Sequence, residues 1–437
     1  MEEPKQEFVF YGCSDFSGIV RGRSFPAATH PDDSPDTAGW VPADQSLTPF
    51  GEIGPGNPFG PIGDLRLKPD KSSEYLATFQ GEESPLHFFL CDIVDFRGEY
   101  WECCARNFLR RGIERLRNKS GLELYASFEH EFTIVTGDRE PEPVFSLRAQ
   151  RLDDDFLCLV SNALRRNGLG PEMVLPEYGK RQFEITMPPR DALKAADDAI
   201  AFREIVRECA RVLEQKVSFC PIVGAGAVSN GVHVHFSLRR DGEPVNYCEG
   251  GPGGMSKELA SFCAGVLFHC GSVAALSSPS VISYERLKPH HWSAAYRCIG
   301  MQNREAAIRV CPVPPGESSR EFLHAELRIG DATASPYMHM GSIVHAGLDG
   351  IENGIDLPAF VERDPADLAP DELTGLGIKE LPQSLKQALT ELEANEVFRN
   401  SASPLFWECY FDMKETERNY VERHDLDEQI RMYMGIY

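Results

Sequence analysis

The chain has 437 residues, of which 42% are hydrophobic and 25% are charged, the proportions of an ordinary globular protein with a sizeable core. Its net charge is −23, which disfavours nucleic acids and anionic membranes as partners. An anionic substrate remains compatible with this charge, because local arginines can override the overall field.

The amino-terminal segment MEEPKQEFVF has neither the basic nor the apolar region of a secretory signal. No stretch reaches the ~18 apolar residues of a membrane span. Thirteen cysteines are scattered without a CxxC pair, which argues against both a disulfide framework and a zinc site. We therefore expect a cytoplasmic protein with reduced thiols.

The first hundred residues alternate short apolar runs with loops rich in Gly and Pro, the pattern of a small β domain. Residues 8–10 and 87–90 are predicted strands. Residues 49–64 form a long Gly/Pro-rich loop between them. A loop of this length is either functional or a surface segment, and the sequence leaves both interpretations open.

From about residue 105 the pattern changes to that of a larger domain. It predicts helices over 105–117 and 383–397 and a strand over 122–135. The strongest helical signal is in 190–217, where apolar residues recur at alternating steps of three and four. The fold class is therefore α+β, with helices packed on a mainly antiparallel sheet.

Two predicted strands carry pairs of ionisable residues on one face. Glu129 and Glu131 are two residues apart, so both point to the same side of a strand. The motif GVHVHFSL repeats this arrangement with His233, His235 and Ser237. One such strand would be typical of a sheet with a solvated face.

Two further strands extend the pattern with Glu184 in QFEIT and with Glu326 and Arg328 in HAELRI. Across the four strands the polar face carries glutamate, histidine and arginine but no lysine. Clustered carboxylates repel one another unless cations neutralise them. Oxygen-rich sites with an occasional imidazole suit Mg²⁺ or Mn²⁺ better than zinc.

Four arginines accompany these strands: Arg286, Arg304, Arg309 and Arg328. Guanidinium groups bind carboxylates and phosphates in a forked geometry. Metal ions beside arginines indicate phosphoryl transfer from a nucleotide to an anionic acceptor. The chain has no GxxxxGK[ST] motif, so the nucleotide must be held in another way.

The order of these motifs resembles the glutamine synthetase superfamily along nearly the whole chain. The segments that carry the resemblance are DFSGIVRGR (15–23), GDLRLKPD (63–70), EHEF (129–132), PEYGKRQFEI (176–185), NGVHVHFSL (230–238), SYERLKP (283–289), NREAAIRV (303–310) and AELRIGDATASPYMHMGSIVHAGLDGIEN (325–353). The resemblance implies a β-grasp domain over residues 1–104 and a catalytic domain over 105–437 with a curved, funnel-shaped sheet. It also implies a homo-oligomeric ring, usually a dodecamer, with active sites between neighbouring subunits.

The resemblance also implies ATP and two to three Mg²⁺ or Mn²⁺ ions per site. Glu131, Glu177 and Glu184 match the ligands of one ion, and Glu129, His233 and Glu326 match those of a second. His235 and Ser237 match nucleotide contacts, Arg304 and Arg309 match phosphate-facing arginines, and Arg286 and Arg328 match the pair that grips glutamate. In this family ATP phosphorylates the γ-carboxylate of glutamate, and an amine then attacks the acyl phosphate.

The sequence departs from the family pattern at the amine end. Trp292 stands where true glutamine synthetases carry a glutamate that helps to deprotonate ammonium. Phe50 aligns with a second, amino-terminal acid, although Glu52 could supply a carboxylate with a small shift. Because aromatic side chains suit an apolar amine better than ammonium, we predict a γ-glutamyl-amide ligase for an apolar or aromatic amine.

Other departures concern the acid and the base. Ser229 replaces a glycine near the glutamate amino group, and His324 stands where an arginine usually contacts ATP. His290 and His291 could form a metal site, a catalytic loop or a surface turn. Six metal ligands are matched elsewhere, which argues against a metal site at these histidines. One of the two histidines could instead serve as the base that acts after attack, and His291 is the chosen candidate. The alternatives are a true glutamine synthetase and a non-catalytic sensing or structural member.

Overall fold

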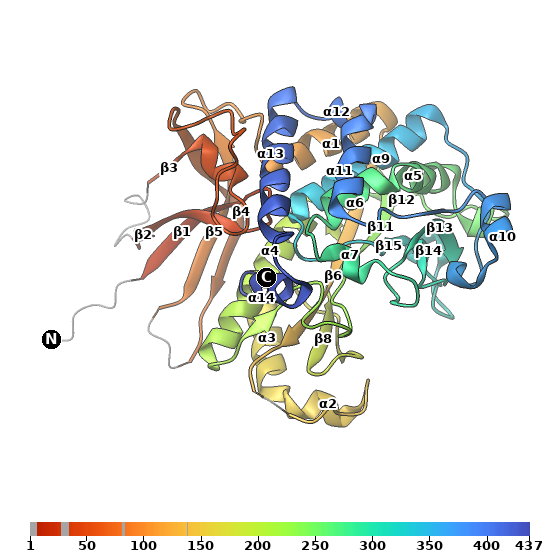
Figure 1. Cartoon of the computed structure of the whole chain (residues 1–437), viewed down its shortest axis with the longest axis horizontal. Helices are drawn as coiled ribbons and strands as arrows, with labels where there is room; N and C mark the ends of the chain where they lie inside the picture. The colour runs from red at the N-terminus through yellow and green to blue at the C-terminus, as the bar shows by residue number, and fades with distance from the viewer. Residues whose placement is uncertain (1–6, 28–34, 81–83, 138) are drawn as a thin grey trace.

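The computed structural model describes residues 7–27, 35–80, 84–137 and 139–437, so most of the segment searched for a signal sequence lies outside it (Figure 1). The amino-terminal part is a five-stranded sheet in the order β2-β1-β5-β4-β3, with β1 and β5 parallel. Its strands are β1 (Phe8–Ser14), β2 (Val20–Pro26), β3 (Ala38–Trp40), β4 (Leu65–Ala77) and β5 (Leu86–Val94). The predicted strands at 8–10 and 87–90 lie inside β1 and β5.

A second sheet of eleven strands forms the centre of the larger part. Eight of them run in the order β16-β13-β14-β15-β11-β6-β8-β7, while β9 and β10 pair with β6 and β12 pairs with β11. Its strands are β6 (Glu123–Ile134), β7 (Met173–Pro176), β8 (Gln182–Thr186), β9 (Arg190–Asp191), β10 (Val217–Ser218), β11 (Val232–Arg240), β12 (Glu243–Pro244), β13 (Tyr296–Met301), β14 (Ala306–Val310), β15 (Ala325–Leu327) and β16 (Lys379–Glu380). Only the β13–β14 pairing is parallel among the described strands of this sheet. The predicted α+β class and mainly antiparallel sheet are confirmed.

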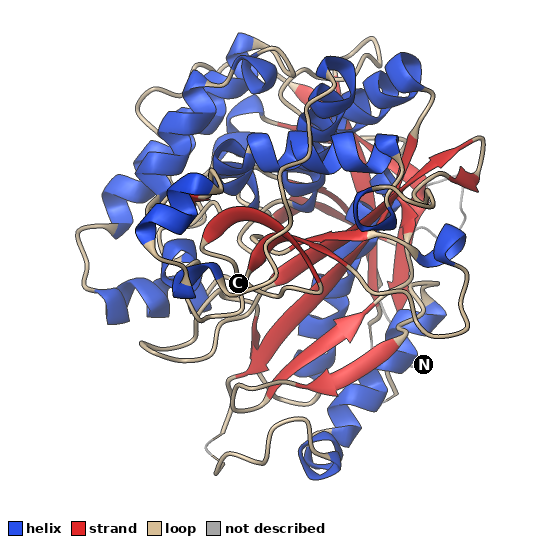
Figure 2. Cartoon of the chain, turned by 90° about the vertical axis from the view of Figure 1, so that its right-hand side faces the viewer, coloured by secondary structure: helices blue, strands red, loops and turns tan. Residues whose placement is uncertain are grey.

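Helices surround this curved sheet (Figure 2). Their bounds are α1 (Ala105–Ser120), α2 (Leu147–Leu152), α3 (Asp154–Arg166), α4 (Ala192–Val212), α5 (Lys257–Phe268), α6 (Cys270–Ser277), α7 (Ser283–Arg286), α8 (Ser319–Phe322), α9 (Pro336–Asn353), α10 (Pro370–Gly375), α11 (Leu385–Ala394), α12 (Glu396–Arg399), α13 (Pro404–Val421) and α14 (Leu426–Met434). Helix α9 is buried along most of its length and packs against α1, α4, α5 and α6.

In the described part of the chain, no single helix is both long and apolar enough to cross a membrane. Helices α5 and α6, bent by 75° at their junction, reach that length and composition only as a pair.

The strongest predicted helix is shorter than its sequence pattern. Helix α4 begins after Asp191, whose side chain accepts a hydrogen bond from the Lys194 N–H, and ends at Val212. The chain then turns through Glu214, which has a φ of 53°. The predicted helix over 383–397 is divided for a similar local reason, because Asn395 caps the start of α12.

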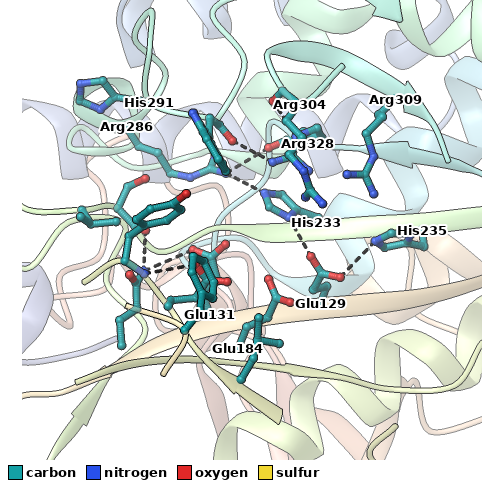
Figure 3. Close-up of a pocket in the computed structure, with 18 of the residues that line it drawn as sticks. Glu129, Glu131, Glu184, His233, His235, Arg286, His291, Arg304, Arg309 and Arg328 are labelled. Atoms are coloured by element: carbon teal, nitrogen blue, oxygen red, sulfur yellow. Dashed lines mark hydrogen bonds and ion pairs between the residues drawn. The ribbon is translucent and has the colours of Figure 1, made fainter. Parts of the chain in front are cut away.

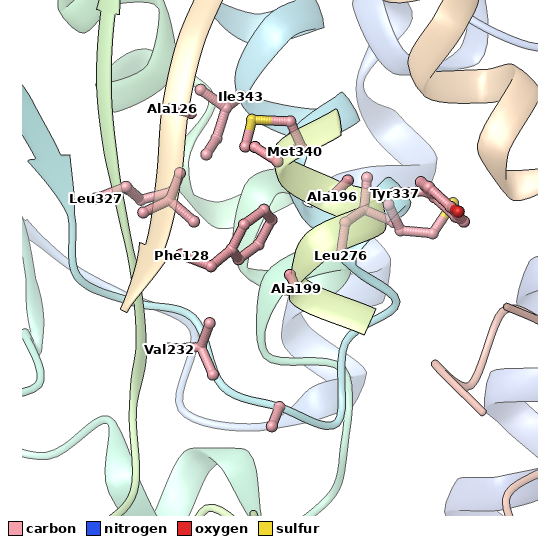
Figure 4. Close-up of a cluster of buried hydrophobic side chains, with 14 of the residues drawn as sticks. Ala126, Phe128, Ala196, Ala199, Val232, Leu276, Leu327, Tyr337, Met340 and Ile343 are labelled. Atoms are coloured by element: carbon pink, nitrogen blue, oxygen red, sulfur yellow. The ribbon is translucent and has the colours of Figure 1, made fainter. Parts of the chain in front are cut away.

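The hydrophobic core lies between the sheet and its helices. Phe128 on β6 points toward Ala199 of α4 and Met340 of α9 (Figure 4). The alternation of side chains along a strand therefore sends Glu129 to the opposite face of the sheet. Burial of the apolar face thus determines which residues can form a polar site on the other.

The Arg106 side chain connects the amino-terminal sheet to the helices that cover the second sheet. Arg106 on α1 is buried and donates two hydrogen bonds to Asp197 of α4, at 3.1 and 2.8 Å. It also contacts Asp92 at 2.8 Å and Asp70 at 2.7 Å, which lie on β5 and β4. The amino-terminal sheet is therefore held against the catalytic part by a charge cluster that has little access to water.

We predict that Arg106→Met lowers the free energy of unfolding by about 3–5 kcal/mol, because it leaves buried carboxylates without their cation. Arg97→Met is the matched control, since the Arg97–Asp95 pair is exposed and its loss should leave the free energy of unfolding nearly unchanged. Urea unfolding followed by tryptophan fluorescence measures both variants. Equal, small losses would show that Arg106 does not hold the two sheets together.

Candidate active site

The four strands with ionisable faces are neighbours in the sheet, in the order β15-β11-β6-β8. Their register, together with that of the adjacent β14, places ionisable residues directly opposite one another. The cross-strand pairs are His233 with Glu129, His235 with Glu326, Glu131 with Glu184, and Arg309 with Glu326. Because opposed residues in adjacent strands have neighbouring side chains, the face becomes one continuous polar cluster.

Two groups within this cluster have the spacing of metal ligands. The donor atoms of Glu129, His233 and Glu326 all lie within 4.8 Å of one another, and so do those of Glu131, Glu184 and His233. His233 Nδ1 is 3.2 Å from Glu129 and 3.4 Å from Glu326. The structure therefore brings together five of the six predicted ligands, and Glu177 lines the same cavity.

The pKa values of two carboxyl groups in this cluster are raised by burial and by the neighbouring negative charges. Burial and the charges of Glu129 and Glu131 raise the pKa of Glu184 to about 11. Burial and Glu131 raise the pKa of Glu177 to about 7. Divalent cations would relieve this repulsion, and carboxylates with one imidazole are a donor set that Mg²⁺ and Mn²⁺ accept. The residues present therefore fit the predicted ions.

Glu326 is the most enclosed acid of the cluster, with no exposed surface. Burial opposes its ionisation, but Arg328 and the two histidines of β11 hold its pKa at about 2. Arg328 Nη1 lies 2.5 Å from one carboxylate oxygen, and Arg309 Nε lies 2.7 Å from the other. Both arginines thus already have a carboxylate partner within the chain.

The acids and arginines face one another across the cavity (Figure 3), whose volume is about 860 Å³. Arg304 lines this cavity and is exposed, and no hydrogen bond or ion pair with the described residues engages its guanidinium. It is therefore the arginine best placed to receive an anionic group from solution.

Arg286 has a different setting, since it is buried and donates to the carbonyls of Arg328 at 3.0 Å and Ile329 at 3.2 Å. Its Nη2 atom lies 3.3 Å from His233 Nε2. A Cβ at Gly231 would stand 2.5 Å from this nitrogen, so the close approach of Arg286 to His233 requires glycine there.

The loop after α7 closes one end of the cavity with a strained backbone. His290, Trp292 and Ala294 all have positive φ, at 63°, 54° and 66°. Such conformations are costly for residues other than glycine and persist where the surroundings hold them. Here the Trp292 N–H donates to Glu305 at 2.8 Å, and Arg328 donates to the Trp292 carbonyl at 2.9 Å.

An aromatic wall stands beside this loop. The Trp292 and Tyr178 rings meet edge to face at 5.1 Å, and Tyr178 meets Phe145 in the same way at 4.8 Å. All three rings line the cavity, and each is roughly half exposed. The sequence pointed to Trp292 but not to Tyr178 or Phe145. Phe145 belongs to no motif, and Tyr178 lies in the motif PEYGKRQFEI, where Glu177 and Glu184 drew attention as metal ligands.

The remaining predicted residues are spread more widely. Ser229, His290 and His291 line the cavity, and His290 pairs with Asp364 at 3.0 Å. Burial and the nearby Lys288 charge lower the pKa of His291, which keeps its imidazole neutral near pH 7. His235 also lines the cavity, whereas Ser237 lies further along β11, outside the lining residues.

Phe50 lies outside this cavity as well. It packs against Tyr420 and Tyr433, with ring centroids at 5.3 and 5.4 Å. Within a single chain it therefore belongs to a small hydrophobic cluster near the carboxyl terminus. A contact between Phe50 and an amine substrate would need the site of another subunit.

A curved sheet that carries acids opposite arginines across one cavity is the arrangement of a carbon–nitrogen ligase. The sequence pattern of the glutamine synthetase catalytic domain matches residues 102–433, and that of the glutamine synthetase N-terminal domain matches residues 2–101. The chain belongs to the glutamine synthetase family, which confirms the predicted family, fold and ATP-dependent ligase class. Membership implies ATP, a divalent metal ion, glutamate and an amine.

Several proteins are similar to this chain along most of its length. It is 29% identical to gamma-glutamylpolyamine synthetase GlnA3 of Streptomyces coelicolor, covering 97% of this chain and 92% of that protein. It is 31% identical to type-1 glutamine synthetase 1 of Dictyostelium discoideum, covering 80% and 72%. A solved structure of a novel glutamine synthase homolog superposes with a TM-score of 0.90 at 38% identity, covering 100% and 99%.

The raised carboxyl pKa of Glu177 predicts that Mn²⁺ binding strengthens as the pH rises from 6 to 8. Below pH 7 the ion must displace a proton from Glu177 in addition to the one that Glu184 carries, so affinity should rise by at least about tenfold per pH unit there. Titration of Mn²⁺, with the free ion followed by electron paramagnetic resonance, measures this. Glu177→Gln should reduce the slope, and Glu172→Gln, which alters an exposed carboxylate outside the cavity lining, should leave it unchanged. A flat profile in the unmodified protein would contradict the prediction.

Proposed function

We propose that this chain joins the γ-carboxylate of glutamate to a bulky amine with an apolar or aromatic body. The observation that carries the proposal is the wall of Trp292, Tyr178 and Phe145 at the end of the cavity where the family pattern carries an acid. Three aromatic rings that line a cavity at half exposure present apolar surface to a ligand.

The proposed reaction has two steps. In the first, an oxygen of the glutamate γ-carboxylate forms a bond to the terminal phosphorus of ATP, and ADP leaves. In the second, the amine nitrogen attacks the γ-carbonyl carbon of γ-glutamyl phosphate, phosphate leaves and the nitrogen loses a proton. The cations held by the glutamates and His233 would neutralise phosphate charge, as Arg304 and Arg309 would.

The chain's own residues divide this work between the two ends of the cavity. We assign glutamate to the region of Arg286, Arg328 and Ser229, and the nucleotide to the side of the cavity that His235 lines. Among the described residues none engages the Arg304 guanidinium, so it is suited to a phosphoryl group that arrives with the substrate. Arg309 and Arg328 instead form ion pairs with Glu326, and both also line the cavity.

The energetics at the amine end favour an apolar body over ammonium. Burial of an aromatic ring against the wall contributes roughly 25 cal/mol per Å² of apolar surface, whereas ammonia has almost none to bury. An arylamine is also largely neutral at pH 7 and needs no acid to deprotonate it before attack. His291, which is neutral near pH 7 and lines the cavity, is the candidate acceptor for the proton released afterwards.

A cationic polyamine is the second candidate. It is favoured by the likeness to gamma-glutamylpolyamine synthetase GlnA3 and by two acids near the aromatic wall. Glu177 lines the cavity, and Glu305 accepts a hydrogen bond from the Trp292 N–H. Aromatic faces also attract cations, at about 0.5–2 kcal/mol for each contact.

We further propose that the protein works as a homo-oligomeric ring, with a dodecamer as the expected form. Phe50 and Glu52 were predicted to approach the amine, yet neither lines the cavity of its own chain. A neighbouring subunit that completes the cavity with its amino-terminal domain would reconcile the two observations.

Purified protein with ATP, Mg²⁺ and glutamate should release phosphate fastest with anilines or other apolar amines. The screen would include ammonia, alkylamines, diamines and polyamines. Ammonia as the best substrate would identify a true glutamine synthetase and overturn the proposal. Polyamines as the best substrates would establish the second candidate, and no turnover with any amine would favour a non-catalytic family member.

Trp292→Glu should shift the preference toward ammonia. The main-chain bonds of residue 292 to Glu305 and Arg328 do not depend on its side chain, so the loop should keep its place. Loss of about 60–100 Å² of apolar contact removes about 1.5–2.5 kcal/mol, a fall of at least about tenfold in kcat/KM for the best amine. Trp292→Phe, which keeps an aromatic ring, is the control. Unchanged amine selectivity in Trp292→Glu would place the indole outside the amine pocket.

A further inference from the structure

A second group of donor atoms lies on the nucleotide side of the cavity, beside the carboxylate cluster. Cys311 follows β14, His324 precedes β15 and His235 lies on β11, three neighbouring strands. The Cys311 N–H donates to the His324 carbonyl at 3.1 Å, which holds the two residues side by side. All three side chains line the cavity, so an ion can reach them from solution.

The separations match the edges of a tetrahedral metal site. His235 Nδ1 lies 3.0 Å from His324 Nε2 and 3.8 Å from Cys311 Sγ. The donor atoms of the three residues all fall within 4.8 Å of one another. Zinc bonds of about 2.0–2.1 Å to nitrogen and about 2.3 Å to sulfur would place tetrahedral N···N and N···S pairs about 3.3 and about 3.6 Å apart.

A hydrogen bond of His324 and the carboxylate contacts of His235 orient the two imidazoles toward each other. His324 Nδ1 lies 2.7 Å from the Phe322 carbonyl, which can only accept, so this nitrogen carries the hydrogen. His235 Nε2 faces Glu129 at 3.2 Å (Figure 3) and Glu326 at 3.7 Å, which both require a donor. Nδ1 of His235 and Nε2 of His324 therefore face each other across 3.0 Å, a contact that needs a proton or a metal ion between them.

We propose that His235, Cys311 and His324 form a third metal site, selective for Zn²⁺ or a similar transition ion over Mg²⁺. A thiolate with two imidazoles is a soft donor set that Mg²⁺ avoids, whereas the neighbouring glutamates are the hard set that it prefers. Arg309 donates to the sulfur at 3.5 Å and supports the thiolate form. The fourth position opens to the cavity, where water or a phosphate oxygen can bind.

This site could not be read from the sequence, which argued against zinc because no CxxC pair is present. Cys311 and His324 are thirteen residues apart, and His235 comes from a distant motif. Only the order β14-β15-β11 brings them together. The proposal also does not depend on the identity of the amine, because its test requires metal binding and no turnover.

Co²⁺ titration of the whole protein in saturating Mg²⁺ tests the site. We expect one equivalent of Co²⁺ per chain to bind with a thiolate-to-cobalt charge-transfer band in the near ultraviolet and intense visible bands of a tetrahedral ion. Stoichiometric Zn²⁺ should displace it. Absence of the charge-transfer band, or octahedral spectra alone, would overturn the proposal, since Co²⁺ would then occupy only the carboxylate sites.

Variants separate this thiolate from the other twelve. Cys311→Ser should abolish the charge-transfer band, while Cys248→Ser, at an exposed cysteine, should keep it. His324→Gln should weaken Co²⁺ binding by at least about tenfold, and it decides the question if Cys311→Ser fails to fold. A charge-transfer band that survives Cys311→Ser or disappears in Cys248→Ser would overturn the three-ligand site. Unchanged Co²⁺ affinity in His324→Gln would overturn it as well. Circular dichroism establishes that each variant is folded.

Discussion

The charge balance around Glu326 is the constraint on which the rest of the site depends. A carboxylate with no exposed surface is stable in its ionised form only when cations surround it. Arg309 contacts Glu326 from the neighbouring strand β14, and Arg328 contacts it from two residues after Glu326 in the chain. His233 and His235 on β11 contact the same carboxylate. The neighbouring strands must therefore keep their register, because a shift of one residue would turn these partners into the hydrophobic core.

The face of each strand was predictable from the sequence, but the register between strands was not. Alternation placed Glu129 and Glu131 on one side and Phe128 on the other, and the structure confirms this. Nothing in the sequence indicated that Glu131 would stand opposite Glu184, because pairing partners depend on strand order and on the lengths of long connections. The family resemblance supplied the ligand grouping, which physical pattern alone could not have produced.

The amine end shows the same division. Trp292 was visible as a departure at a known position in a motif. Tyr178 and Phe145 were not, since their roles arise only when two loops meet the Trp292 loop in space. The proximity of Cys311 to His324 was equally hidden, because neighbouring strands, and not sequence spacing, bring them together. Sequence periodicity thus indicates which face of a strand a side chain lies on, whereas its neighbours in space depend on the order of the strands in the sheet.

Arg328 touches both ends of this arrangement, since one guanidinium binds Glu326 and the carbonyl of Trp292. Anything that draws Glu326 away changes how firmly Arg328 holds the Trp292 loop. Thermodynamic linkage then requires reciprocity: whatever factor a cation contributes to amine affinity, the amine must contribute to cation affinity. The carboxylate cluster and the Trp292 loop are thus linked through a single side chain.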